Sequence, residues 1–192
     1  MKIQELLEER LDAVTRRWVE EALATYPEDS AALFMREQDP FANPLGASVR
    51  KGTRGLLGAI LGEMDSAQIH EHLDEIIRIR AVQEFPPSRA LSFVFSLKPI
   101  LRTVLPEAAE DGRLAQELAE MDARIDRVAL MAFDHYAACR EEVAQLRIDE
   151  AKRQVTWVLE KINQRTLNAN GAAARPDRRT SMVENVQGED LR

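Results

Sequence analysis

Residues 125–146, which read IDRVALMAFDHYAACREEVAQL, decide the fold. Apolar side chains recur there every seven residues in two rows: Ile125, Ala132, Cys139 and Leu146 in the first, and Ala129, Tyr136 and Val143 in the second. Such a repeat is typical of a helix that packs along one side. The surrounding residues 111–165 contain no proline, and no glycine after Gly112. One helix of about 55 residues is therefore predicted, roughly 80 Å long at a rise of about 1.5 Å per residue.

Beyond Leu146 the apolar repeat changes its register. It moves to Ile148, Val155 and Ile162, with Ala144, Ala151 and Val158 between them. A register change indicates a change of packing partner. We therefore expect residues 1–146 to form the domain, and residues 147–166 to project as a linker helix that pairs with another chain. The alternative is two helices folded back on each other near residues 146–148, where no turn signal lies.

Shorter helices are predicted before this segment. The first covers residues 3–25 and ends at Tyr26-Pro27, because a residue before proline avoids helical backbone angles. Its apolar stripe consists of Leu7, Leu11, Val14, Trp18 and Ala22. Residues 26–46 are predicted as a loop with one short helical turn at residues 31–35. Further helices are expected over residues 45–62, 66–83 and 88–105.

Local signals refine these helices. Ser66 and Ser88 are predicted to cap the last two of them, and Pro99 is expected to kink or divide the last near Leu97. The small residues Gly55, Ala59 and Gly62 would allow a close approach between backbones. Residues 167–192 show no periodicity and are predicted to be a disordered tail. The fold class is therefore all-α.

Composition limits the possible partners and locations. The formal net charge is −7, and an acidic surface repels the phosphates of nucleic acid. A single cysteine, Cys139, cannot form a disulfide within the chain. No apolar run approaches the roughly 18 residues that cross a bilayer, and the first residues lack the apolar core of a signal peptide. A cytoplasmic protein without membrane insertion is expected.

A search for catalytic and metal-binding residues predicts neither kind of site. His70 and His72 are two residues apart on a helix, so they point in different directions and are expected to be exposed. His135 is either a haem or metal ligand or a histidine hydrogen-bonded at the edge of the core; the second reading is favoured. Cys139 lies four residues from His135, a spacing at which the pair could activate a thiolate. It also lies on the apolar seam, where burial makes a thiol inert, and this second reading is favoured. The protein is therefore predicted to be no enzyme.

Two arginines and a lysine are candidate ligand-binding residues. Arg78 and Arg80 lie among β-branched residues, and Arg80 continues the apolar stripe of its helix, so it should lie near the core. A buried guanidinium needs an acceptor. It either faces an anion in a cavity or pairs with a carboxylate of the long helix; the candidate partners are Asp122, Asp126 and Asp134. Lys98 poses the same question, although the tip of its long side chain is expected to reach solvent.

Four segments together carry a resemblance to a known family. They are residues 39–46 (DPFANPLG), residues 74–88 (DEIIRIRAVQEFPPS), residues 93–98 (FVFSLK), and residues 132–136 (AFDHY) followed by Cys139-Arg140-Glu141. In this order they resemble the RsbRD-type N-terminal domain, the sensor half of RsbR-type co-antagonist proteins of bacterial stressosomes. The resemblance covers roughly residues 5–150.

The resemblance implies an all-helical, globin-like sensor domain that usually binds no haem. It also implies a homodimer and a linker helix that passes the signal to a C-terminal STAS domain. No STAS domain follows here, so a stand-alone domain without the phosphorylated threonines of that half is expected. No catalytic residue is carried over from the family.

These observations predict a non-enzymatic sensor of the stress response that signals through an unknown regulatory protein and needs no cofactor. The predicted ligand-binding residues are Arg78, Arg80, Lys98, His135 and Tyr136. The predicted dimer and partner surface consists of Leu7, Leu11, Val14, Trp18, Ile148, Val155, Val158 and Ile162. The alternative is a globin-like sensor that binds haem at His135 or another small ligand.

Overall fold

Every secondary-structure element of the described chain is a helix. The computed structural model describes residues 3–173, and their side chains as far as Leu167. Within that range there is no strand, so the all-α prediction is confirmed. The elements are α1 (Ile3–Glu9), α2 (Leu11–Leu23), α3 (Glu28–Arg36), α4 (Pro44–Leu61), α5 (Ser66–Val82), α6 (Pro87–Val104), the short 3₁₀ helix η1 (Pro106–Ala109) and α7 (Gly112–Ala173).

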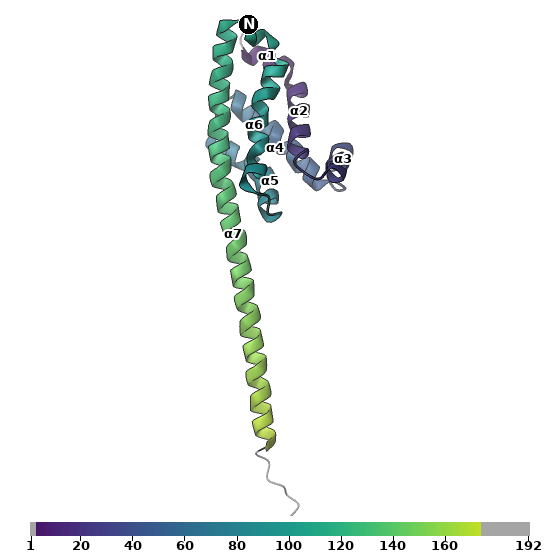
Figure 1. The fold of residues 1–192 in the computed structure, drawn as a ribbon, viewed down its shortest axis with the longest axis vertical. Helices are drawn as coiled ribbons and strands as arrows, with labels where there is room; N and C mark the ends of the chain where they lie inside the picture. The colour runs from purple at the N-terminus through teal and green to yellow at the C-terminus, as the bar shows by residue number, and fades with distance from the viewer. Residues whose placement is uncertain (1–2, 174–192) are drawn as a thin grey trace, which may run out of the picture. The chain divides into compact units, whose positions relative to one another are not determined.

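The chain forms two units, which divide between Gln145 and Leu146. The first unit contains α1 to α6, η1 and the part of α7 up to Gln145. In it α4 lies against α5, and α2 lies against both α4 and α6 (Figure 1). The described part of the second unit is the rest of α7, which is a single helix. Its side chains are described as far as Leu167.

The long helix is continuous, as predicted, and the alternative of two helices folded back on each other is wrong. It ends at Ala173, later than the predicted end near Arg165. Alanine is a strong helix former and no proline occurs before Pro176, so nothing in the sequence stops the helix at Leu167. The rest of the predicted tail, residues 174–192, lies outside the described residues.

Several predicted helix ends are corrected. The predicted helix over residues 3–25 is broken at Arg10, which leaves the helical conformation while its guanidinium binds Glu107. A full helix, α3, replaces the predicted short turn. The side chain of Asp65, and not that of Ser66, caps α5 by accepting from the Gln68 N–H, and Pro87 rather than Ser88 begins α6.

Pro99 does not divide α6, which continues through it to Val104. An internal proline costs roughly 3 kcal/mol of helix stability. The same helix buries a full apolar face that outweighs this cost, namely Ala90, Leu91, Phe93, Val94, Leu97, Ile100 and Leu101.

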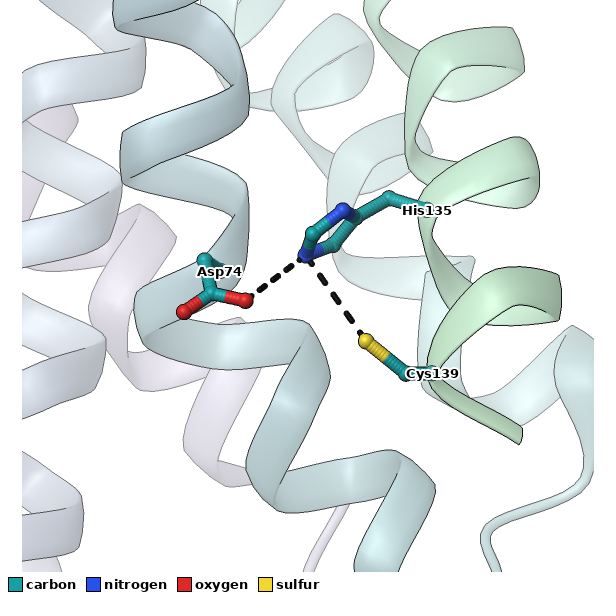
Figure 2. Close-up of side chains that lie close together, drawn as sticks. All are labelled: Asp74, His135 and Cys139. Carbon is teal, nitrogen blue, oxygen red and sulfur yellow. Dashed lines mark hydrogen bonds and ion pairs between the residues drawn. The ribbon is translucent and has the colours of Figure 1, made fainter. Parts of the chain in front are cut away.

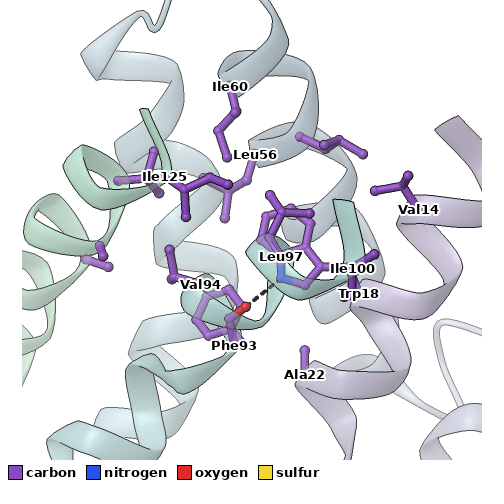
Figure 3. Close-up of a cluster of buried hydrophobic side chains, with 14 of the residues drawn as sticks. Val14, Trp18, Ala22, Leu56, Ile60, Phe93, Val94, Leu97, Ile100 and Ile125 are labelled. Carbon is purple, nitrogen blue, oxygen red and sulfur yellow. Dashed lines mark hydrogen bonds between the residues drawn. The ribbon is translucent and has the colours of Figure 1, made fainter. Parts of the chain in front are cut away.

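The core of the first unit lies between α2, α4, α6 and α7 (Figure 3). Trp18 of α2 is fully buried at its centre, and its indole N–H donates to the Phe93 carbonyl at 2.6 Å. The two aromatic rings are stacked, with centroids 6.2 Å apart. The α7 part of this unit contributes an apolar face consisting of Leu114, Leu118, Met121, Ile125, Val128, Ala129, Ala132, Tyr136 and Cys139.

The predicted close approach through small residues is confirmed at Gly55 of α4, where an added Cβ would lie 2.4 Å from the ring of His72. Gly52, one turn earlier, is equally tight. A Cβ there would lie 2.8 Å from Ile76 Cγ1 and 2.9 Å from the carbonyl oxygen of His72. These two glycines therefore allow α4 and α5 to pack with their backbones close together.

The two helix glycines Gly52 and Gly58 make a matched pair for mutation. Gly52→Ala is expected to lower the free energy of unfolding by roughly 1–3 kcal/mol, because the new methyl group meets the backbone of α5. A Cβ at Gly58 meets no atom within 4 Å. Gly58→Ala should therefore raise the free energy of unfolding by up to about 1 kcal/mol through helix propensity alone. Urea unfolding checks both; equal effects of the two substitutions would contradict the described packing.

The ion pair between Arg10 and Glu107 is expected to make the stability of the fold sensitive to acid. The guanidinium binds both oxygens of Glu107, at 2.6 and 3.1 Å, and lowers the pKa of that carboxyl from 4.5 to about 2. A lowered pKa in the folded state stabilises the fold above pH 4.5, and this contribution is lost as the pH falls from 4.5 to about 2.

We expect Glu107→Gln to flatten the pH dependence of stability in that window. The measurement is thermal unfolding at a series of acidic pH values. Arg10→Gln removes the other partner and should flatten the same window. If both variants lose stability in acid as steeply as the natural chain, the ion pair does not contribute.

Candidate functional site

Asp74 of α5 and the pair His135 and Cys139 of α7 form a polar cluster between the two helices (Figure 2). The Nε2 atom of His135 lies 2.9 Å from Asp74 Oδ1 and 3.8 Å from Cys139 Sγ. One ligand atom from each residue lies within 4.8 Å of the other two. Both helices belong to the first unit, so this cluster is part of the folded domain.

The cluster is half covered by the surrounding protein. The Cys139 side chain is buried, whereas the His135 and Asp74 side chains are 20% and 40% exposed. Burial raises the pKa of the Cys139 thiol, and the nearby Arg78 guanidinium partly opposes this shift. Without a bound ion, the thiol is therefore protonated at neutral pH, and His135 Nε2–H donates to the Asp74 carboxylate.

Helical spacing explains why these residues meet. His135 and Cys139 are four residues apart, so they lie on one face of α7. His70 and Asp74 are also four residues apart, on the face of α5 that meets α7. The ring of His70 lies 5.9 Å from that of His135, centre to centre. Two i, i+4 pairs thus face each other across the helix contact.

The sequence did not predict this cluster. Asp74 appears there only within a family motif, Cys139 is predicted to be inert, and His70 is predicted to be exposed. His70 is exposed as predicted, but it lies beside His135. The two i, i+4 pairs were visible in the sequence, but nothing local showed that their helices are neighbours.

His72 is half-buried rather than exposed, which corrects the prediction. Its ring packs against Gly55 of α4, and its Nδ1 is buried without a hydrogen-bond partner among the described residues. His72 therefore belongs to the contact between α4 and α5, on another side of α5 from the cluster.

Arg80 is buried, but its predicted pairing with a carboxylate of α7 is wrong. Its guanidinium donates to two backbone carbonyls, Ala90 O at 2.7 Å and Ala22 O at 2.8 Å. The guanidinium carbon also lies 4.7 Å from the centre of the Phe93 ring. Burial lowers the pKa of this guanidinium. Arg80 joins α2, α5 and α6, and backbone oxygens provide the acceptors that a buried charge requires.

Two of the three carboxylates predicted as partners of Arg80 bind other side chains. Asp126 binds Lys98 of α6 at 2.7 Å, and Asp122 binds Arg102 of the same helix. Asp134 is exposed. The Lys98 side chain is 23% exposed, and the ion pair that its Nζ atom makes with Asp126 lies at an exposed position.

The other predicted ligand-binding residues have different partners and line no common cavity that the structure shows. Arg78 Nε donates to Asp74 Oδ1 at 3.1 Å. Tyr136 is buried, and its hydroxyl donates to the Phe85 carbonyl. Arg78 and His135 contact a common partner, Asp74, whereas Arg80 and Tyr136 both contact Phe85. The structure disfavours haem binding at His135, because iron at His135 Nε2 would have to displace Asp74 and Cys139.

The predicted dimer surface separates into two sets. Leu7, Val14 and Trp18 are buried in the core of their own domain, and Leu11 packs against that core, so this part of the prediction is wrong. The sequence pattern of an apolar stripe is the same whether the stripe is buried in the core or covered by a partner. In contrast, Ile148, Val155, Val158 and Ile162 are 45–60% exposed.

An open groove on the first unit lies between α2, α3 and α4. Its volume is about 680 Å³, and its lining is mainly charged. Arg16, Arg50, Lys51 and Arg54 contribute positive charge, and Asp12 and Glu20 contribute negative charge. None of the predicted ligand-binding residues lines it.

The described chain is a small all-α domain with a polar cluster of Asp74, His135 and Cys139 between α5 and α7. A comparison with protein families then identifies it. Residues 12–151 match the family of the RsbT co-antagonist protein RsbRD N-terminal domain. The chain belongs to this family, as the sequence motifs predicted, and is therefore an RsbR-like regulatory sensor domain.

No curated protein and no solved structure matches the chain. The globin-like arrangement therefore stays a prediction. None of the described helices is both long enough and apolar enough to cross a membrane.

Proposed function

We propose that the chain is a non-enzymatic regulatory domain that forms a homodimer and signals to another cytoplasmic protein through α7. One observation carries this proposal, namely an exposed apolar stripe on the second unit. We call it the α7 seam, and it consists of Ile148, Ala151, Val155, Val158 and Ile162. Membership of a family of regulatory domains supports a role in signalling rather than catalysis.

The α7 seam has the pattern of a two-stranded coiled coil. At about 100° per residue its five side chains fall within an arc of about 80°. Ile148, Val155 and Ile162 occupy one heptad position, and Ala151 and Val158 occupy the other. In parallel two-stranded coiled coils the first of these positions commonly holds β-branched residues, as it does here. A second copy of the same helix is therefore the partner that fits this seam best.

A charge introduced into the α7 seam is expected to weaken the dimer. Val155→Asp would bury two carboxylates in the dimer, one from each copy, and each costs at least the roughly 1–3 kcal/mol of a buried neutral polar group. The dimer dissociation constant should rise by roughly 100-fold or more, since about 1.4 kcal/mol corresponds to a factor of ten. Sedimentation equilibrium of the full chain measures this constant.

Trp157 supplies the matched control on the same helix. It is 59% exposed, but it lies about 200° away from Val155 around the helix axis. Trp157→Gln should leave the dimer intact. A natural chain that stays monomeric at every concentration, or a Val155→Asp chain that dimerises as well as the natural one, would contradict the proposal.

The alternative hypothesis of a haem sensor has a simple test. An absorption spectrum after expression with excess haem would show a Soret band if His135 bound the iron. We expect no such band, because His135 Nε2 faces Asp74 and Cys139.

A further inference from the structure

We propose that the cluster between α5 and α7 is a binding site for one zinc-like transition-metal ion. Asp74, His135 and Cys139 would provide three ligands, and His70 the fourth. The ligand atoms of the first three already lie within 4.8 Å of one another. This site is independent of the proposed dimer, because all four residues belong to the first unit.

The distances are close to those of a tetrahedral site. Bonds of about 2.0–2.3 Å from zinc to oxygen, nitrogen and sulfur place the ligand atoms about 3.4–3.6 Å apart. His135 Nε2 lies 2.9 Å from Asp74 Oδ1 and 3.8 Å from Cys139 Sγ. The distance between the other two ligand atoms is at most 4.8 Å, so modest side-chain rotations would bring the three to tetrahedral spacing.

The position of His70 completes the set. It lies one helical turn before Asp74 on the same face of α5, and its ring centre is 5.9 Å from that of His135. The His70 side chain is exposed, so its ring can turn toward the ion without displacing core atoms. Each helix then contributes two ligands at i and i+4.

The ligand types select the metal. Imidazole nitrogen and thiolate sulfur favour zinc and similar transition metals, whereas Mg²⁺ and Ca²⁺ require oxygen ligands. One thiolate and one carboxylate carry two negative charges, which balance a divalent ion. A neutral complex suits this half-covered position better than separate charges would.

Binding changes the protonation of two side chains. The thiol of Cys139 loses its proton to solvent when the sulfur binds the ion, and the neutral imidazole of His135 carries its proton on Nδ1 instead of Nε2. Arg78, which donates to Asp74 Oδ1 at 3.1 Å, would orient the carboxylate from outside the ligand set.

Cobalt(II) titration of the full chain tests the site directly, with any affinity tag removed and the thiol reduced. Cobalt replaces zinc in tetrahedral sites and reports a thiolate ligand by a charge-transfer band in the near ultraviolet. We expect this band to saturate at one ion per chain, and zinc to abolish it. Absence of the band in the natural chain at saturating cobalt would overturn the proposal.

Substitutions assign the individual ligands. Asp74→Asn and His70→Ala affect side chains that are at least partly exposed. Each should weaken zinc binding by at least roughly 10- to 100-fold, the loss that even outer-shell partners produce. Cys139→Ser should also remove the charge-transfer band, and circular dichroism checks that this variant is folded.

Glu71→Gln and Asp134→Asn are matched controls, because each neutralises an exposed carboxylate directly next to a proposed histidine ligand. Both should bind zinc like the natural chain. If the controls weaken binding as much as the ligand variants do, only surface charge attracts the ion, and the site is rejected. Unchanged affinity in His70→Ala would overturn the four-ligand assignment.

Discussion

Replacing Arg80 with methionine is expected to lower the free energy of unfolding by about 3 kcal/mol. Arg80 is fully buried, and its guanidinium donates to the carbonyls of Ala22 and Ala90. Hydrogen bonds that involve a charged group contribute about 1.5–3 kcal/mol each. Removing a buried charge also removes its desolvation cost, so the net loss is smaller than the sum of the two bonds.

Urea unfolding monitored by circular dichroism measures the change. Arg78→Met is the matched control, because Arg78 is exposed and only two residues away. It should change stability by less than about 0.5 kcal/mol. If Arg80→Met is as stable as the natural chain, Arg80 does not hold α2, α5 and α6 together, and the anion-binding interpretation would gain support.

Replacing Trp18 with alanine is expected to have an effect at least as large, about 3–5 kcal/mol. Trp18 is fully buried at the centre of the core, where it stacks on Phe93. Trp18→Phe keeps most of the apolar volume but removes the N–H that donates to the Phe93 carbonyl. The difference between the two variants separates the packing contribution from that of the hydrogen bond.

The Trp18 variants also distinguish core from interface. Loss of core packing lowers the stability of the domain at every protein concentration, whereas loss of a dimer contact acts through the concentration dependence. Trp157→Ala, at an exposed tryptophan of α7, provides the comparison and should leave the stability of the domain unchanged. A Trp18→Ala chain that stays folded but no longer dimerises would show that Trp18 belongs to the dimer interface.

The sequence predicted where the helices lie along the chain better than which residues they contact. The long helix could be predicted because α7 has neither proline nor internal glycine over more than fifty residues. The break at Arg10 could not, because the side chain that Arg10 binds there, Glu107, is 97 residues away in the chain. Local propensity contains no information about such a partner.

The same limit applies to the candidate site. Asp74 and His135 are separated by 61 residues, and only the packing of α5 against α7 brings them together. For Arg80, the need for an acceptor was predicted correctly, but backbone carbonyls fulfil it. Any residue can offer a carbonyl, so no sequence pattern marks this kind of partner.

The pairing of two copies through the α7 seam is the central claim, and cross-linking tests it most directly. Cysteine would be introduced as Val158→Cys or, as a control off the seam, as Trp157→Cys, and each chain treated with a short bis-maleimide. The natural chain controls for Cys139, which is buried. The proposal predicts a covalent dimer with Val158→Cys and little with Trp157→Cys. Equal cross-linking of both variants, or none at position 158, would contradict it.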